Sequence, residues 1–204
     1  MFLALVAVAV QNPLTAGDFF PMQPGTVWTY ESSGDQSGIY DQAIGQAANI
    51  GGKTIHPVLT VNNGKILMKT FYEATPSGLY ILGQDPEKPF AKPQPVFQFD
   101  PKGAKWEFEG ASPYESDTQA GMRMTGSSKL VGERDVLGEK RLCLEVKSDT
   151  KIGLTSESAT TFKQTMVFAK DVGMVSLEQS AQLGRRTTKF KVKLIKFEKA
   201  GAFE

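Results

Sequence analysis

The sequence has very few of the side chains on which most catalytic and metal sites depend. Among its 204 residues there is one histidine, His56, and one cysteine, Cys143. One histidine excludes a site built on several histidines, including the two-histidine zinc motifs. One cysteine excludes an internal disulfide. We therefore expect no metal site and no cofactor.

A strong charge of one sign is also absent. The formal net charge is +1 and the isoelectric point is about 7.7, which is far from the basic balance typical of nucleic-acid-binding proteins. We expect no nucleic-acid partner. The charge is uneven, however, because residues 185–204 contain seven basic and two acidic side chains.

Long apolar runs are missing except at the start, where residues 1–10 read MFLALVAVAV. This run is too short to span a bilayer and has the length of the apolar region of a secretory signal. Ala7 and Ala9 supply a cleavage motif, so the mature chain is expected to begin near Val10 or Gln11. We predict a signal-peptide-like segment with a short leader over 1–17, one domain over 18–204, no transmembrane helix, and export to the periplasm or the cell exterior.

Beyond residue 20, turn residues interrupt the chain at short intervals, and apolar and polar residues alternate between them. This rhythm predicts an all-β protein of about ten strands, arranged as a single curved antiparallel sheet or half-open barrel. Gly51-Gly52 and Asn63-Gly64 predict tight turns between strands. Residues 41–50 are the only helix candidate, and their pattern is ambiguous between helix and strand.

Two aromatic segments have the same layout. Gly25 precedes Trp28 by three residues, Gly103 precedes Trp106 by three, and a second aromatic residue follows each tryptophan two positions later. A turn followed by alternating aromatic residues is typical of the start of a strand whose aromatic side chains face the core. We predict that both tryptophans occupy comparable core positions.

Four segments together resemble a group of exported bacterial proteins of unknown function, some labelled TapB-like. They read FFPMQPGTVWTYE (19–31), GGK (51–53), PVFQFDPKGAKWEFEG (95–110) and VFAKDVGMVSLEQ (167–179). The resemblance implies a β architecture similar to periplasmic lipoprotein-carrier-like half-barrels. It implies no catalytic residues.

No residue pattern indicates a reaction. His56 could act as a general base, although a hydrogen-bonded strand histidine is the commoner situation. Glu107 and Glu109 share one strand face and could pair as acid and base, but such alternation usually marks the wet face of a strand. A nucleophilic Cys143 would need a basic partner that only His56 could provide. We predict no catalytic residues and no enzyme activity.

The pattern favours a non-catalytic exported envelope protein with a binding or scaffolding role. In its sharper version the protein carries an apolar ligand or lipid in the concave face of the sheet, although the same aromatic residues could simply fill the core. The alternatives are a structural or assembly factor of a pilus or secretion system, with an envelope protein as partner, and a hydrolase using His56. The candidate ligand-binding residues are Trp28, Tyr30, Phe71, Trp106, Phe108 and Phe168.

The basic C-terminal segment is a candidate anion-facing surface. Its alternation with apolar residues predicts a strand whose charged side chains point away from the core. Lysines on an edge strand commonly prevent edge-to-edge aggregation, which we favour here. The other explanation is attraction to anionic lipid head groups or envelope polysaccharide. The residues concerned are Arg185, Arg186, Lys189, Lys191 and Lys193.

Overall fold

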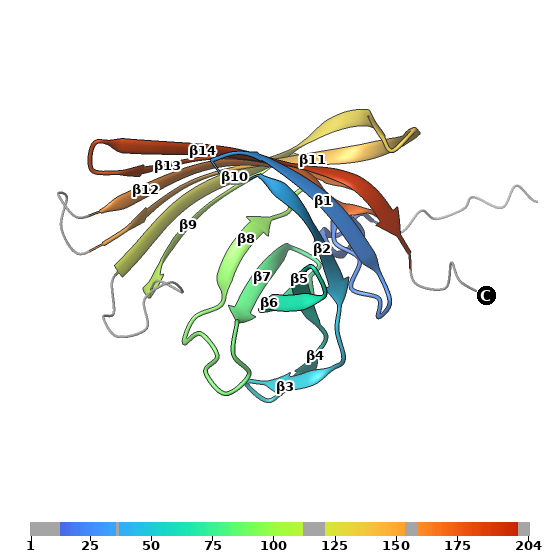
Figure 1. Cartoon of the computed structure of the whole chain (residues 1–204), viewed down its shortest axis with the longest axis horizontal. Coiled ribbons are helices and arrows are strands. Elements are labelled where there is room, and N and C mark those ends of the chain that lie inside the picture. The colour runs from blue at the N-terminus through green and yellow to red at the C-terminus, as the bar shows by residue number, and fades with distance from the viewer. Residues whose placement is uncertain (1–12, 36, 112–120, 154–158, 200–204) are drawn as a thin grey trace, which may run out of the picture.

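The computed structural model describes residues 13–35, 37–111, 121–153 and 159–199. The described part is almost entirely β (Figure 1). It comprises one short 3-10 helix, η1 (Ala16–Phe19), and fourteen strands: β1 (Val27–Gly34), β2 (Gly38–Ile44), β3 (Ala48–Ile50), β4 (Lys53–Ile55), β5 (Pro57–Asn62), β6 (Lys65–Thr75), β7 (Gly78–Gly83), β8 (Gln94–Gln98), β9 (Ala104–Ala111), β10 (Gly121–Val136), β11 (Glu139–Ile152), β12 (Thr160–Ala169), β13 (Gly173–Leu183) and β14 (Arg186–Glu198).

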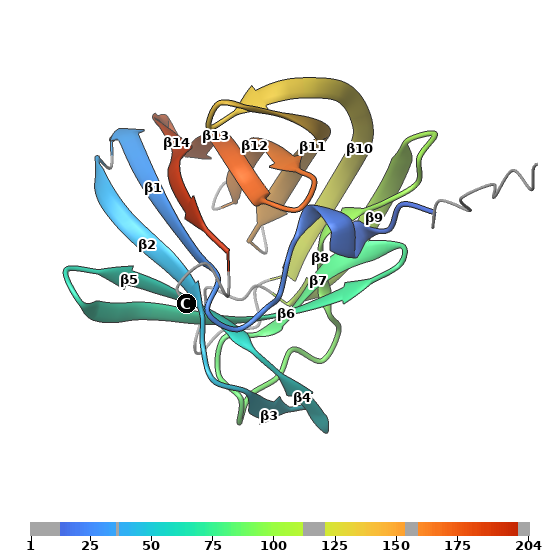
Figure 2. The ribbon, with the colours of Figure 1, turned by 90° about the vertical axis from the view of Figure 1, so that its right-hand side faces the viewer.

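Twelve of these strands form one antiparallel sheet, in the order β8-β7-β6-β5-β2-β1-β14-β13-β12-β11-β10-β9. The sheet curls until its edge strands β8 and β9 lie near each other, so the fold approaches a closed barrel (Figure 2). Strands β3 and β4 form a separate hairpin. The all-β, antiparallel prediction is confirmed, with more strands and a more closed barrel than expected.

The predicted turns have the backbone geometry that their residues allow. Gly51, Gly52, Asn63 and Gly64 all have positive φ, which glycine adopts without strain and asparagine tolerates. Residues 41–50, ambiguous in the sequence, contribute to β2 and β3.

The C-terminal strand β14 lies in the middle of the sheet. It pairs with β1 on one side and β13 on the other, so the prediction of an edge strand protected by lysines is wrong. Lys189, Lys191 and Lys193 are exposed, as expected from the alternation. Ile195 is an extra residue between Leu194, which faces Tyr30, and Lys196, which faces Thr29; a bulge was expected here.

One end of the barrel, which we call the plugged end, is filled by η1 and aromatic side chains. Phe19 is fully buried and contacts Phe99, and the rings of Phe97 and Phe168 lie 4.9 Å apart. Trp28 Nε1 donates a 2.5 Å hydrogen bond to the carbonyl of Val172. The polar atom of this large buried side chain therefore has a partner, as a stable core requires.

Because neighbouring strands are antiparallel, alternate connections lie at the same end of the barrel. The β13–β14 turn lies at the end opposite η1, which we call the distal end (Figure 1), and by alternation the β1–β2 and β5–β6 turns belong to the same set of connections. The β10–β11 hairpin turns at the plugged end. Its residue Val136 joins Cys143 and Val167 in one buried cluster, although both of these side chains face outward by strand alternation.

Candidate functional site

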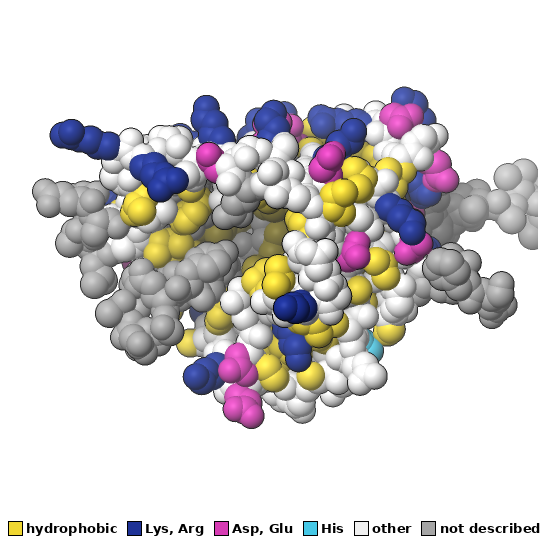
Figure 3. Space-filling view, viewed as in Figure 1, with side chains coloured by type: hydrophobic (Ala, Val, Ile, Leu, Met, Phe, Trp, Pro, Cys, Tyr) yellow, Lys and Arg dark blue, Asp and Glu magenta, His cyan; other side chains and the backbone are white. Residues whose placement is uncertain are grey.

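The distal end contains an apolar cluster that is separate from the main core. Phe108, Met122, Met124 and Ile152 are each less than 10% exposed, and Phe162 packs against them. They come from four adjacent strands, β9 to β12, and all face the barrel interior because their registers are aligned. The barrel interior is therefore apolar at the distal end as well, in a cluster that is separate from the main core at the plugged end. Figure 3 shows the molecule hollowed between the two halves of the sheet, with hydrophobic side chains inside the hollow.

A row of polar side chains crosses the inner face beside this cluster. Ser148, Gln164 and Gln179 are cross-strand neighbours on β11, β12 and β13. Ser148 Oγ donates to Gln164 Oε1 over 3.3 Å, and Gln164 Nε2 donates to Gln179 Oε1. Ser148 is buried and both glutamines are half-buried. A polar row between two apolar regions gives the interior an amphipathic character.

Trp106 occupies the β9 end of the same row. It pairs with Gly126, and a Cβ at Gly126 would overlap the indole ring, so only glycine permits this packing. The indole is 5% exposed, and its Nε1 has no hydrogen-bond partner among the described residues. A buried unpaired N–H group is uncommon because it loses its hydration without compensation.

A positive charge lies at the rim of the apolar cluster. Lys92, in the connection between β7 and β8, places its Nζ 4.9 Å from the centroid of the Phe108 ring. The same ammonium group donates to the carbonyl of Glu109 over 3.3 Å. The Lys92 side chain is exposed, so it remains available to an anionic group at the mouth of the barrel.

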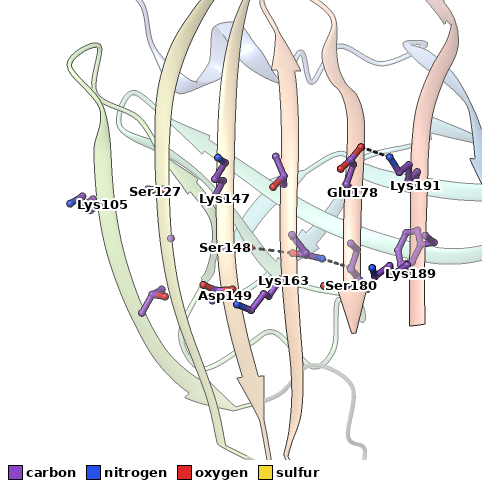
Figure 4. A pocket seen from close by; sticks show the side chains of 16 residues that line it. Lys105, Ser127, Lys147, Ser148, Asp149, Lys163, Glu178, Ser180, Lys189 and Lys191 are labelled. Carbon is purple, nitrogen blue, oxygen red and sulfur yellow. Dashed lines mark hydrogen bonds and ion pairs between the residues drawn. The ribbon is translucent and has the colours of Figure 1, made fainter. Parts of the chain in front are cut away.

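The outer face of the sheet carries a shallow groove of about 780 Å³ that crosses β9 to β14 (Figure 4). Lys191 Nζ donates to Glu178 Oε1 over 2.7 Å, and Lys163 Nζ lies 4.0 Å from Asp149 Oδ1. Basic side chains outnumber acidic ones, so the groove is a positively charged surface. Its charged residues are Lys105, Lys147, Asp149, Lys163, Glu178, Lys189 and Lys191.

The predicted anion-facing residues fall in different places. Lys189 and Lys191 line the outer groove. Lys193 lies beside a second groove, of about 580 Å³, together with Cys143 and Leu137. Arg185 and Arg186 are at the β13–β14 turn. Anion binding by these residues stays a prediction.

The predicted concave-face residues separate into three groups. Trp28, Tyr30, Trp106 and Phe168 belong to the main core, with Trp106 at its border with the polar row, while Phe108 belongs to the distal cluster. Phe71 packs outside the barrel with Ile50 and Leu82, in a small cluster under the β3–β4 hairpin.

The inward-facing methionines of β10 and the inward-facing Gln164 were not predicted from the sequence. The methionines of β10 alternate as Met122 and Met124, and Gln164 shares the strand parity of Phe162 and Met166. That parity was the available signal for an inward-facing glutamine.

The remaining chemical candidates are separate and individually unremarkable. His56 Nδ1 lies 2.8 Å from the carbonyl oxygen of Gly45. Cys143 is fully buried, and this burial raises the pKa of its thiol, which disfavours the nucleophilic thiolate. Glu107 and Glu109 are exposed, and Glu109 forms an ion pair with Arg123.

Neither a metal-binding cluster nor a membrane-spanning helix occurs in the described ranges. Three or more histidine, cysteine, aspartate or glutamate side chains do not gather there in a way that could hold a metal ion. Helices long and apolar enough to cross a bilayer are likewise absent from the described residues.

Comparisons with known proteins add no family. No protein-family profile matches the chain, so the TapB-like resemblance gains no support, and no curated protein sequence matches it. Solved structures are similar only at low identity. A protein described as a lipoprotein from Parabacteroides distasonis has 12% identity, a TM-score of 0.47, and coverage of 92% of this chain and 100% of its own.

Two further structures are similar in the same way. An exported protein with YmcC-like fold from Bacteroides fragilis has 13% identity, a TM-score of 0.46, and coverage of 89% of this chain and 99% of its own. The hypothetical lipoprotein YmcC from Escherichia coli has 12% identity, a TM-score of 0.36, and 85% coverage of each chain.

Proposed function

We propose that this chain is a non-catalytic, exported binding protein that carries an amphipathic ligand, with an apolar chain and an anionic head group, in the distal end of its barrel. The observation that carries the proposal is the distal interior itself. An apolar cluster lies beside a polar row and a buried, unpartnered indole N–H, and a lysine lies at its rim. Export is supported by the apolar run at residues 1–10.

Each part of the distal end matches one part of such a ligand. The side chains of Phe108, Met122 and Met124 are buried against one another, so an acyl chain would enter by parting them, and methionine adapts readily to irregular shapes. Trp106 Nε1 can donate to an oxygen of the ligand, which would satisfy this buried group. The Lys92 ammonium suits a carboxylate or phosphate at the mouth.

The first test is saturable binding of a medium-chain fatty acid, followed by the fluorescence of Trp106 in a Trp28→Phe background. Ligand bound at the distal end should change this emission, because the two tryptophans are the only ones in the chain. Organic extraction of the protein purified from its native host, followed by mass spectrometry, should recover an amphipathic molecule. Absence of saturable binding together with an empty extract would refute the carrier.

The second test separates recognition of the head group from non-specific hydrophobic binding. Lys92→Gln should weaken binding of the fatty acid about tenfold, which is about 1.4 kcal/mol, and should leave binding of the corresponding fatty alcohol unchanged. Lys102→Gln is the matched control, because Lys102 is also an exposed loop lysine but does not touch the cluster. Equal losses for acid and alcohol would contradict a role for the Lys92 charge.

A further inference from the structure

The tip of the β5–β6 hairpin exposes three apolar residues in a row. Ile66, Leu67 and Met68 are 54%, 65% and 40% exposed. A regular strand would turn alternate side chains inward, but here Val61 pairs with Ile66 and Thr60 pairs with Met68, which leaves Leu67 as an extra residue. A run of exposed apolar side chains on a water-facing surface is unfavourable unless something covers it.

Basic residues flank this run on both sides. Lys65 and Lys69 are exposed, and neither has an ion pair within the described part of the chain. Ile39, which is 58% exposed, lies on the neighbouring strand β2 and faces the same side of the sheet as Ile66. Apolar side chains between lysines form an amphipathic tip.

The hairpin is placed where a carrier would meet its source of ligand. By the alternation of connections, its turn belongs to the same set as the β13–β14 turn at the distal end, where the apolar cluster and the rim lysine lie. Figure 2 shows the β5–β6 hairpin extending outward from the wall of the barrel. Its tip can therefore reach a surface without rearrangement of the sheet.

We propose that this hairpin tip docks on an anionic lipid surface, with Ile66 and Leu67 entering the boundary between head groups and acyl chains while Lys65 and Lys69 contact lipid phosphates. Lysine stems can lie along apolar surface while their ammonium groups stay in water, which suits this interfacial position. Docking rests on the proposed function for its purpose, because a lipid carrier must meet a bilayer. The contacts of the tip itself are independent of the ligand site.

A second copy of the chain is a poorer occupant of the same patch. A symmetric contact would place the same patch on both sides, and would therefore bring Lys65 and Lys69 of one copy toward those of the other. Three or four side chains also fall well short of the area that a stable protein interface needs. Charge complementarity favours the anionic lipid surface.

The direct test is co-sedimentation with vesicles of phosphatidylcholine alone and of phosphatidylcholine with phosphatidylglycerol. We expect binding to the anionic vesicles that weakens with salt. The double variants Ile66→Ser with Leu67→Ser, and Lys65→Gln with Lys69→Gln, should each reduce this binding at least tenfold. Leu137→Ser and Lys140→Gln with Lys151→Gln are matched controls at exposed sites elsewhere, and both should bind like the unmodified protein.

Insertion is tested separately by placing a fluorophore at the tip. Tryptophan in Leu67→Trp should shift its emission to shorter wavelength with anionic vesicles and be quenched by brominated acyl chains. The native tryptophans are 5% exposed or less, and the emission of the unmodified protein with the same vesicles is subtracted as their contribution. An unshifted, unquenched Leu67→Trp, or serine variants that sediment like the unmodified protein, would overturn the proposal.

The outcomes for docking and for the carrier can be told apart. Hairpin variants that lose vesicle binding but still bind a fatty acid from solution would support docking. If the unmodified protein binds the fatty acid but no vesicles, docking is overturned and the carrier stands. If the serine variant instead abolishes a dimer seen by sedimentation equilibrium, the patch belongs to a second copy and docking is overturned.

Discussion

The two tryptophans show how differently the two ends of the barrel are completed. Trp28 and Trp106 both follow a positive-φ glycine by three residues, both are at most 5% exposed, and each packs onto a glycine, Gly173 or Gly126. Trp28 donates to a backbone carbonyl, whereas the N–H group of Trp106 has no partner among the described residues. The two indoles are therefore equally buried but differ in hydrogen bonding.

The difference arises from what the chain supplies opposite each ring. At the plugged end the β12–β13 turn brings the carbonyl of Val172 to the Trp28 indole, and Tyr30 donates to the carbonyl of Met174 over 2.9 Å. At the distal end the neighbouring polar side chains bond one another along the row from Ser148 to Gln179. Equal burial therefore does not imply equal hydrogen bonding.

The largest expected effect is a loss of stability caused by a substitution at the plugged end. Trp28→Ala should lower the free energy of unfolding by about 3 to 5 kcal/mol, because it leaves a large cavity and removes the partner of Val172. Denaturant titration followed by circular dichroism measures the change. A loss of less than about 1 kcal/mol, typical of surface sites, would show that this ring is not part of the core.

Gly126→Ala should lower the free energy of unfolding by a smaller amount. The added methyl group overlaps the Trp106 indole, and such overpacking costs about 1 to 3 kcal/mol. The displaced ring should also become more accessible to acrylamide in a Trp28→Phe background. Gly121→Ala, on the same strand with nothing within 4 Å of the added atom, is the control and should change neither property.

Replacing each tryptophan by phenylalanine sharpens the comparison. Both changes reduce ring size, but only Trp28→Phe removes a made hydrogen bond, so it should cost about 1 kcal/mol more than Trp106→Phe. Denaturant titration of the two variants side by side gives the difference. Equal costs would mean that the Trp106 N–H has a partner in solution, such as water.

The smallest effect is a loss of stability at alkaline pH. Burial raises the pKa of the Cys143 thiol in the folded chain, so the unfolded chain releases this proton first and stability falls as the pH rises above about 8.5. Burial raises the pKa of Tyr40 to about 12 and that of Tyr30 as well, which extends the fall. Cys143→Ala should flatten the decline between pH 8 and 9.5; an unchanged slope would exclude the thiol.

Local sequence signals were sufficient for the strands and for much of the core. The turns at Gly51-Gly52 and Asn63-Gly64 need positive φ, and the alternation after Gly25 and Gly103 places Trp28 and Trp106 inside. These features depend on neighbours in the chain, which a pattern can report. The burial predicted for both tryptophans is confirmed.

Long-range pairing and single-residue shifts escaped prediction. Nothing near Lys189 indicates that its strand pairs with β1, so a central strand was taken for an edge. A register shift lies beside Phe71, whose side chain packs outside the barrel with Ile50. The extra residue Leu67 leaves three consecutive apolar residues, 66–68, exposed. One added residue reverses which face a side chain occupies.

The central place of β14 also determines when the sheet can be completed. Trp28 on β1 faces Phe197 on β14, so this pairing joins positions near opposite ends of the chain. Most other neighbours in the sheet are successive hairpin strands that can form early. During synthesis β1 cannot form this pairing until β14 has emerged. Closing so long a loop is then slow. The pairing of β1 with β14 therefore closes the longest loop between neighbouring strands of the sheet.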